Sequence, residues 1–199
     1  MTDRPAAASR RPQRADSRLA PLLDAAAAQF ALRGYEAASI RDIVRGVGML
    51  PGSLYYHFAN KDELLVAVYA EGVRRIGEAV SAAIERHADP WDRLEAACAA
   101  HLESLLDHSA YAKVVIAVRP DGVPSVEHKL VALRDSYERL FVMLIDALPL
   151  PPRTPRAPLR MLLLGALNWT PTWFRPGGAS SPQRVARGYL QLLKDRLQP

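Results

Sequence analysis

The sequence has 199 residues, 49% hydrophobic and 24% charged, so it is long enough to bury a core and is not expected to be disordered. One cysteine, Cys98, excludes an internal disulfide framework and a CxxC metal site, which favours a reducing compartment. The net charge of +5 allows an acidic partner, whereas the absence of a long apolar run or a signal peptide pattern excludes a membrane-spanning or exported chain, so we expect a soluble, cytoplasmic protein.

Residues 1–15 are predicted to form a disordered basic arm. They contain Arg4, Arg10, Arg11 and Arg14 and no apolar stripe. Such an arm suits contact with phosphates or a minor groove, although a solvated tail fits the same composition.

Residues 19–58 are predicted to form three helices, because apolar residues recur there every three or four positions. The first helix ends at Gly34. A short second helix begins after Ser39, a favourable N-cap residue, and ends at Gly48. The third begins about four residues later and carries Leu54, Tyr55 and Phe58. Two short helices joined by a glycine turn are typical of a helix-turn-helix.

Six further helices are predicted after residue 60, and no segment has the pattern of a strand. They cover approximately residues 61–88, 90–106, 111–118, 124–148, 159–174 and 182–197. The side chain of Asn60 is expected to cap the first of these helices. Five prolines between residues 149 and 158 predict an extended loop, because each removes an amide donor and restricts φ. The predicted fold class is therefore all-α.

Residues 34–65, GYEAASIRDIVRGVGMLPGSLYYHFANKDELL, resemble the DNA-binding signature of the TetR family. The matching positions are Gly34, Tyr35, Ile40, Ile43, Gly48, Gly52, Ser53, Leu54, Tyr55, Tyr56, His57, Phe58, Lys61, Leu64 and Leu65. The resemblance implies a helix-turn-helix DNA-binding domain in residues 16–62 and a helical ligand-binding and dimerisation domain in residues 63–199. It also implies a repressor that binds a palindromic operator as a homodimer and is released by a small-molecule effector.

Two kinds of DNA contact are expected from this segment. Polar groups at the ends of the motif suit phosphate contacts, and they are Ser39, Tyr56, His57 and Lys61. Base reading is expected at the start of the recognition helix and on its flanks, from Arg41, Leu50, Pro51, Gly52, Ser53 and Tyr55. Leu50 departs from the family, which usually has a hydroxyl residue there, so Pro51 has to define the helix start.

Residues 165–178 resemble the C-terminal signature of TetR regulators that control fatty-acid and steroid catabolism and respond to acyl-CoA thioesters. Residues 153–199 carry eight Arg or Lys residues and one acidic residue, which suits the phosphates of CoA. The expected ligand-binding residues are His101, Arg160, Leu163, Leu167, Trp169, Trp173 and Arg175. The expected dimer-interface residues are Leu164, Leu167, Tyr189 and Leu193, and the two tryptophans suit that interface as well.

The main alternative is a repressor with the same fold and a different effector. A repressor of an efflux pump that senses cationic or aromatic drugs needs buried carboxylates among aromatic residues, whereas the candidates occupy polar positions: Glu103, Asp107, Glu138 and Asp146. This favours the acyl-CoA interpretation.

Catalysis and metal binding are not expected. No hydrolase, phosphate-loop or dinucleotide motif is present, so the chain is not expected to be an enzyme. Cys98, His101 and His108 share a helix face, but core packing or a ligand pocket explains them better than a metal. The expected partners are operator DNA, a second copy and the effector, with no cofactor and no membrane.

Overall fold

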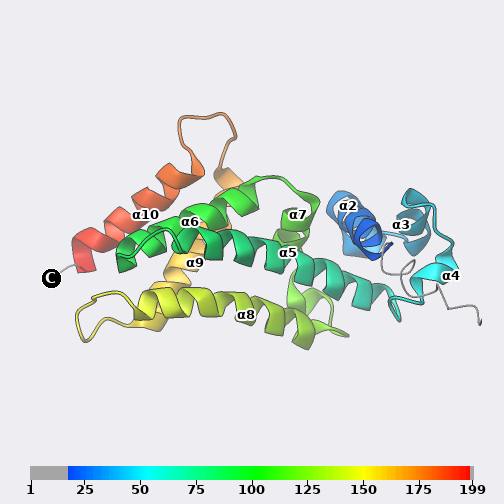
Figure 1. Ribbon diagram of the computed structural model, residues 1–199, viewed down its shortest axis with the longest axis horizontal. Helices are drawn as coiled ribbons and strands as arrows, with labels where there is room; N and C mark the ends of the chain where they lie inside the picture. Colours follow the sequence, from blue (N-terminus) through cyan, green and yellow to red (C-terminus); the bar gives the residue numbers. More distant parts are fainter. Residues whose placement is uncertain (1–17, 198–199) are drawn as a thin grey trace, which may run out of the picture.

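The computed structural model describes residues 18–197, and every regular element in that range is a helix (Figure 1). The elements are α2 (Leu19–Ala37), α3 (Ile40–Gly46), α4 (Pro51–Leu54), α5 (Lys61–Ile84), α6 (Pro90–Leu106), α7 (Ala110–Ala117), the 3-10 helix η1 (Pro120–Gly122), α8 (Glu127–Asp146), α9 (Arg156–Trp173) and α10 (Pro182–Leu197). The predicted all-α class is confirmed, and the predicted basic arm lies outside the described residues. Among residues 18–197, none of the helices combines the length and the apolar character that crossing a bilayer requires.

Capping side chains determine where helices begin. The Ser39 hydroxyl accepts a hydrogen bond from the Arg41 amide ahead of α3. The Asn60 side chain accepts one from the Glu63 amide ahead of α5. Gly34 has a φ of 78° inside α2, a left-handed conformation that glycine adopts without strain, and the helix bends there. The predicted caps are confirmed, whereas α2 bends at Gly34 and continues to Ala37 instead of ending at Gly34 as predicted.

Several predicted boundaries were wrong. The third helix, α4, is a single turn ending at Leu54, and residues 55–57 form a turn. The helix expected from residue 124 begins at Glu127, since η1 and a turn precede it. Helix α9 begins at Arg156 instead of residue 159. Pro158 lies in its first turn, where the missing N–H costs nothing because the first amides of a helix have no internal partner.

The helices pack around two hydrophobic cores. Helices α2, α3 and α4 lie at one end of the molecule, and α5 runs from that end alongside α8, with α6 and α10 packed together on its other side (Figure 1). The first core contains Leu22, Phe30, Ile43, Leu54, Leu65, Tyr111 and Leu130, and the second contains Trp91, Leu102, Phe141, Leu163, Leu167 and Leu190. Because α5, α7 and α8 contribute to the first core, the helix-turn-helix is packed directly against the second half of the chain.

Candidate functional site

Helices α3 and α4 carry exposed side chains on one side and buried side chains of the first core on the other. Leu54 is fully buried, whereas Leu50, Tyr55 and Tyr56 are 77%, 57% and 88% exposed. Arg41, Pro51 and Gly52 are exposed as well. The residues predicted to contact DNA are therefore brought together at one end of the molecule, on a support fixed by the first core.

Lys61 has a role that the sequence did not indicate. Its Nζ donates hydrogen bonds to the carbonyl oxygens of Tyr35, Glu36 and Ala38 at 2.8, 3.1 and 3.3 Å, and it lies 4.4 Å from the centre of the Tyr35 ring. The last carbonyls of a helix lack internal partners, so this ammonium group satisfies the end of α2 and ties it to α5. The predicted phosphate contact of Lys61 stays a prediction beside this structural role.

A second candidate site is a cavity of about 510 Å³ between α5, α6, α7, α8 and α9. Most of its wall is apolar, including Val73, Ile76, Leu105, Val115 and Leu164. The polar groups that line it are His101, Tyr137, Asn168, Arg119, Arg134 and Glu138. This combination of an apolar wall and a few polar groups is typical of small-molecule sites.

His101 is the centre of a polar cluster in this wall. Its Nδ1 lies 2.6 Å from the hydroxyl of Tyr137, and its Nε2 lies 3.2 Å from Oδ1 of Asn168. The ring stacks on Tyr137 and meets the edge of Phe141. Burial lowers the pKa of His101 to about 4, so the imidazole is neutral at physiological pH. It is an uncharged hydrogen-bonding group.

Sequence reasoning found His101 but missed Tyr137 and Asn168. Tyr137 is 36 residues from His101 and Asn168 is 67 residues away, so only the packing of three helices brings them together. One signal was available, because Tyr137 stands in the apolar stripe that contains Leu130 and Phe141. A hydroxyl in such a stripe needs a buried partner.

The other predicted ligand residues do not line the cavity. Leu163 and Leu167 are buried in the second core, whereas Trp169 and Trp173 are 67% and 45% exposed. Arg175 is exposed, and Arg160 is paired with Glu138 at 2.7 Å. The physical reason is the rotation of α9. Its cavity face carries Met161, Leu164, Gly165 and Asn168, and the predicted residues lie on other faces of the same helix or, for Arg175, beyond its end.

The predicted dimer-interface residues mostly pack inside their own chain. Leu167 is fully buried, so its assignment to an interface was wrong. Leu164, Tyr189 and Leu193 are half-buried against the second core, and their interface role stays a prediction. The exposed apolar side chains of α9 and α10 are instead Met161, Leu162, Trp169, Trp173 and Leu192.

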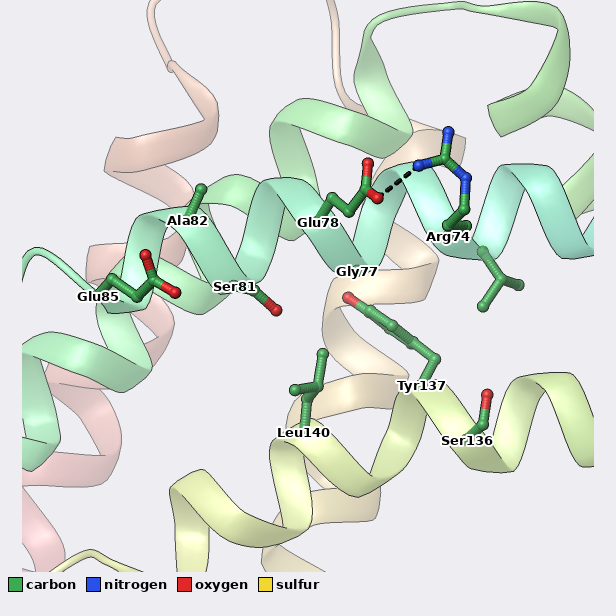
Figure 2. A pocket seen from close by; sticks show the side chains of 10 residues that line it. Arg74, Gly77, Glu78, Ser81, Ala82, Glu85, Ser136, Tyr137 and Leu140 are labelled. Atoms are coloured by element: carbon green, nitrogen blue, oxygen red, sulfur yellow. Dashed lines mark hydrogen bonds and ion pairs between the residues drawn. The ribbon is translucent and has the colours of Figure 1, made fainter.

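A shallow groove lies on the outer surface between α5 and α8, and Figure 2 shows its lining. Tyr137 reaches from α8 toward α5 there, and Arg74 pairs with Glu78. Val73 and Tyr137 line both this groove and the cavity, so their side chains form a shared wall. Because the groove is more open to solvent than the cavity, the cavity is the better ligand site.

Helix α7 connects the cavity with the helix-turn-helix. Val115 and Ile116 line the cavity, and Tyr111 on the same helix donates a hydrogen bond to Asp24 on α2 at 2.9 Å. The Arg75 guanidinium lies 4.1 Å from the centre of the Tyr111 ring and 3.7 Å from Asp24. A shift of α7 caused by a ligand would therefore act directly on α2.

No three His, Cys, Asp or Glu side chains between residues 18 and 197 are grouped as a metal site would need. Cys98 is fully buried, and burial raises the pKa of its thiol. Both ring nitrogens of His101 are engaged by Tyr137 and Asn168.

Two family models match the chain. The one described as bacterial regulatory proteins of the tetR family matches residues 22–68, and the one described as a tetracyclin repressor-like C-terminal domain matches residues 87–197. The HTH-type transcriptional repressor KstR2 of Mycobacterium tuberculosis is 30% identical over 185 residues, which cover 89% of this chain and 92% of the relative.

Solved structures share the fold over most of the chain. The ketosteroid transcriptional regulator KstR2 of M. tuberculosis aligns with a TM-score of 0.68 and 24% identity over 98% of this chain and 100% of that one. AibR in complex with isovaleryl coenzyme A and operator DNA aligns at 0.73 and 22% identity, over 88% and 97%. The superantigen PfiT aligns at 0.76 and 30% identity, over 89% and 94%.

Proposed function

The chain belongs to the TetR family of bacterial regulatory proteins, and from this premise we propose that it is a ligand-responsive repressor that binds a palindromic operator as a homodimer. The observation that carries the proposal is the presence of two features in one chain, connected by α7. An exposed helix-turn-helix surface lies at one end, and α7 links it to a mainly apolar cavity. A regulator needs both features, and neither of them needs catalytic groups.

The second copy is proposed to pack on the exposed apolar face of α9 and α10. Leu162, Trp169 and Leu192 are 64%, 67% and 70% exposed there. Large apolar side chains concentrated on two adjacent helices suit a two-fold interface, in which the same patch of each copy meets its equivalent. A dimer also presents two recognition helices to a palindrome, with half-sites about 34–36 Å apart.

The proposed effector is an acyl-CoA thioester. The apolar wall suits an acyl chain. Arg119 and Arg134 line the cavity, and within residues 18–197 they pair only with neighbouring aspartates in the chain, Asp121 and Asp135. The side chains of these ion pairs are at least half exposed, so the pairs are weak, and both guanidinium groups suit phosphates. A cationic drug is less well matched, because the carboxylate in the wall, Glu138, is already paired with Arg160. The isovaleryl-CoA complex of AibR and the ketosteroid regulator KstR2 add support from similar folds.

The first test is selection of operators from a random DNA duplex library by the full chain. We expect an inverted repeat with half-sites about 10–10.5 base pairs apart, and an affinity that falls steeply with salt. His57→Ala and Tyr56→Phe are each expected to cost on the order of 1 kcal/mol per lost contact without unfolding the chain. Absence of any enriched sequence, or a flat salt response, would refute the proposed DNA binding.

The second test is release of that operator by octanoyl-CoA and isovaleryl-CoA. Because coupling is reciprocal, the thioester must bind more weakly to the DNA complex by the factor that it weakens DNA binding. Release by cationic drugs but by neither thioester would favour the efflux-pump alternative.

A further inference from the structure

The hydrogen-bond direction around His101 follows from its protonation state. A neutral imidazole has one donor nitrogen and one acceptor nitrogen. Its Nε2 faces Oδ1 of Asn168, which can only accept, so Nε2 carries the proton. Its Nδ1 must then accept, and the Tyr137 hydroxyl is the donor at 2.6 Å. The chain of hydrogen bonds therefore runs in one direction, from Tyr137 through His101 to Asn168.

This direction determines what Asn168 offers to a ligand. With Oδ1 occupied by His101, the hydrogen bonds of the described residues leave the amide nitrogen of Asn168 unused. Asn168 lines the cavity and is exposed there, beside the backbone of Gly165, which has no side chain to cover it. The cavity wall thus presents an uncharged N–H donor held in one orientation.

We infer that the amide of Asn168, held by His101 and Tyr137, recognises a carbonyl oxygen of the effector. The inference rests on the proposed function and names the chemical class that the cavity selects: an apolar chain bearing a carbonyl acceptor, such as a thioester. An ammonium group is itself a donor and cannot accept the N–H of Asn168. An all-hydrocarbon ligand would leave that N–H without an acceptor. His101 and Tyr137 are positioning residues, because they act through Asn168.

The test compares two ligands that differ only in the carbonyl. Octanoyl-CoA and S-octyl-CoA, a thioether with a methylene in place of the carbonyl, are titrated calorimetrically into the full chain, with isovaleryl-CoA and its thioether as a second pair. We expect the wild type to bind each thioester roughly three- to tenfold more tightly than its thioether, which is the effect of one neutral hydrogen bond.

Variants test whether this preference depends on the chain of hydrogen bonds from Tyr137 through His101 to Asn168. Asn168→Asp keeps the acceptor for His101 and removes the donor, and Asn168→Leu removes the donor without adding charge. Both should reduce the ratio of the two affinities to about one. Tyr137→Phe should lower the ratio too, since His101 can then reverse its direction, whereas a purely structural defect would weaken both ligands equally. Gln191→Glu, an amide-to-acid change at an exposed residue outside the cavity whose side chain donates a hydrogen bond to Asp195 of its own helix, should preserve the ratio.

The outcomes separate the inference from the proposed function. Equal binding of thioester and thioether by the wild type would overturn the inference and leave the acyl-CoA effector standing. A preference that survives in both Asn168 variants would overturn it as well. Binding of none of the four ligands would overturn the thioester effector and the inference together.

Discussion

The two halves of the chain hold their functional groups in opposite ways. In the helix-turn-helix, the candidate groups are exposed or half-buried and almost consecutive, from Leu50 to His57, above a core that the same short segment helps to build. In the second half, the cluster of His101, Tyr137 and Asn168 is assembled from three helices around a cavity. A surface that must meet DNA can be recognised in a short motif, whereas a cavity depends on how whole helices are rotated.

The largest expected effect tests whether operator binding by the helix-turn-helix depends on dimerisation through α9 and α10. Leu162→Arg places a charge in the proposed dimer face, where burial without a partner is strongly unfavourable. We expect a monomer by analytical ultracentrifugation, unchanged helical content, and a loss of operator affinity of at least about a hundredfold, because one recognition helix reads one half-site. Leu32→Arg, at a 76% exposed leucine of α2, is the matched control and should remain dimeric. A dimeric Leu162→Arg variant would place the interface elsewhere.

The second effect tests the burial of His101. Burial holds the pKa of His101 at about 4, below its ordinary 6.5, so the unfolded chain binds the proton more readily. The stability due to neutral His101 is therefore complete above pH 6.5 and is lost as the pH falls toward 4. Between pH 7.5 and 5 the loss is about 2 kcal/mol. Urea unfolding of His101→Gln should show a pH dependence smaller by this amount, while His128→Gln, at an exposed histidine, should match the wild type. An unchanged dependence in His101→Gln would contradict the burial of a neutral histidine.

The same contrast explains how much the sequence could predict. The helix types, the caps at Ser39 and Asn60, and the helix-turn-helix depend on local patterns, and they were predicted correctly. Residues 161–167 are apolar at nearly every position, so periodicity could not distinguish the core face with Leu167 from the cavity face with Leu164. Their roles follow from the rotation of α9, which long-range packing determines.

Lys61 combines features of both halves, because it is a motif residue whose structural role depends on tertiary contacts. Lys61→Met leaves three carbonyl groups at the end of α2 without this donor, and we expect a loss of about 1–2 kcal/mol of stability in urea unfolding. Lys113→Met, at an exposed lysine of α7, is the control and should change little. The salt dependence of operator binding tests the phosphate contact separately. A slope lower by about one per protomer would show that Lys61 contacts DNA as well.

The smallest effect concerns base reading by α4. Residues 46–59 contain no Arg, Lys, Asn or Gln, the side chains that pair in bidentate fashion with guanine or adenine. The most prominent groups at the start of α4 are instead apolar, and Leu50 is 77% exposed without capping the helix. An exposed leucine in a major groove can contact the methyl group of thymine, which uracil lacks. We therefore expect one thymine in each half-site to be read by Leu50.

Replacing thymine by deoxyuridine at single positions of the selected operator measures this contact. At the position read by Leu50, the wild type should lose about 0.8 kcal/mol per half-site, the contribution of one buried methyl group. Leu50→Ala should bind both operators equally, because the partner of the methyl group is already gone, whereas Leu32→Ala should keep the full sensitivity. If no single thymine matters, or if Leu50→Ala retains the sensitivity, base reading depends on Arg41, Ser53 or Tyr55. In the helix-turn-helix, as on α9, the residues that stand out most in the sequence would then not be the ones that recognise the ligand.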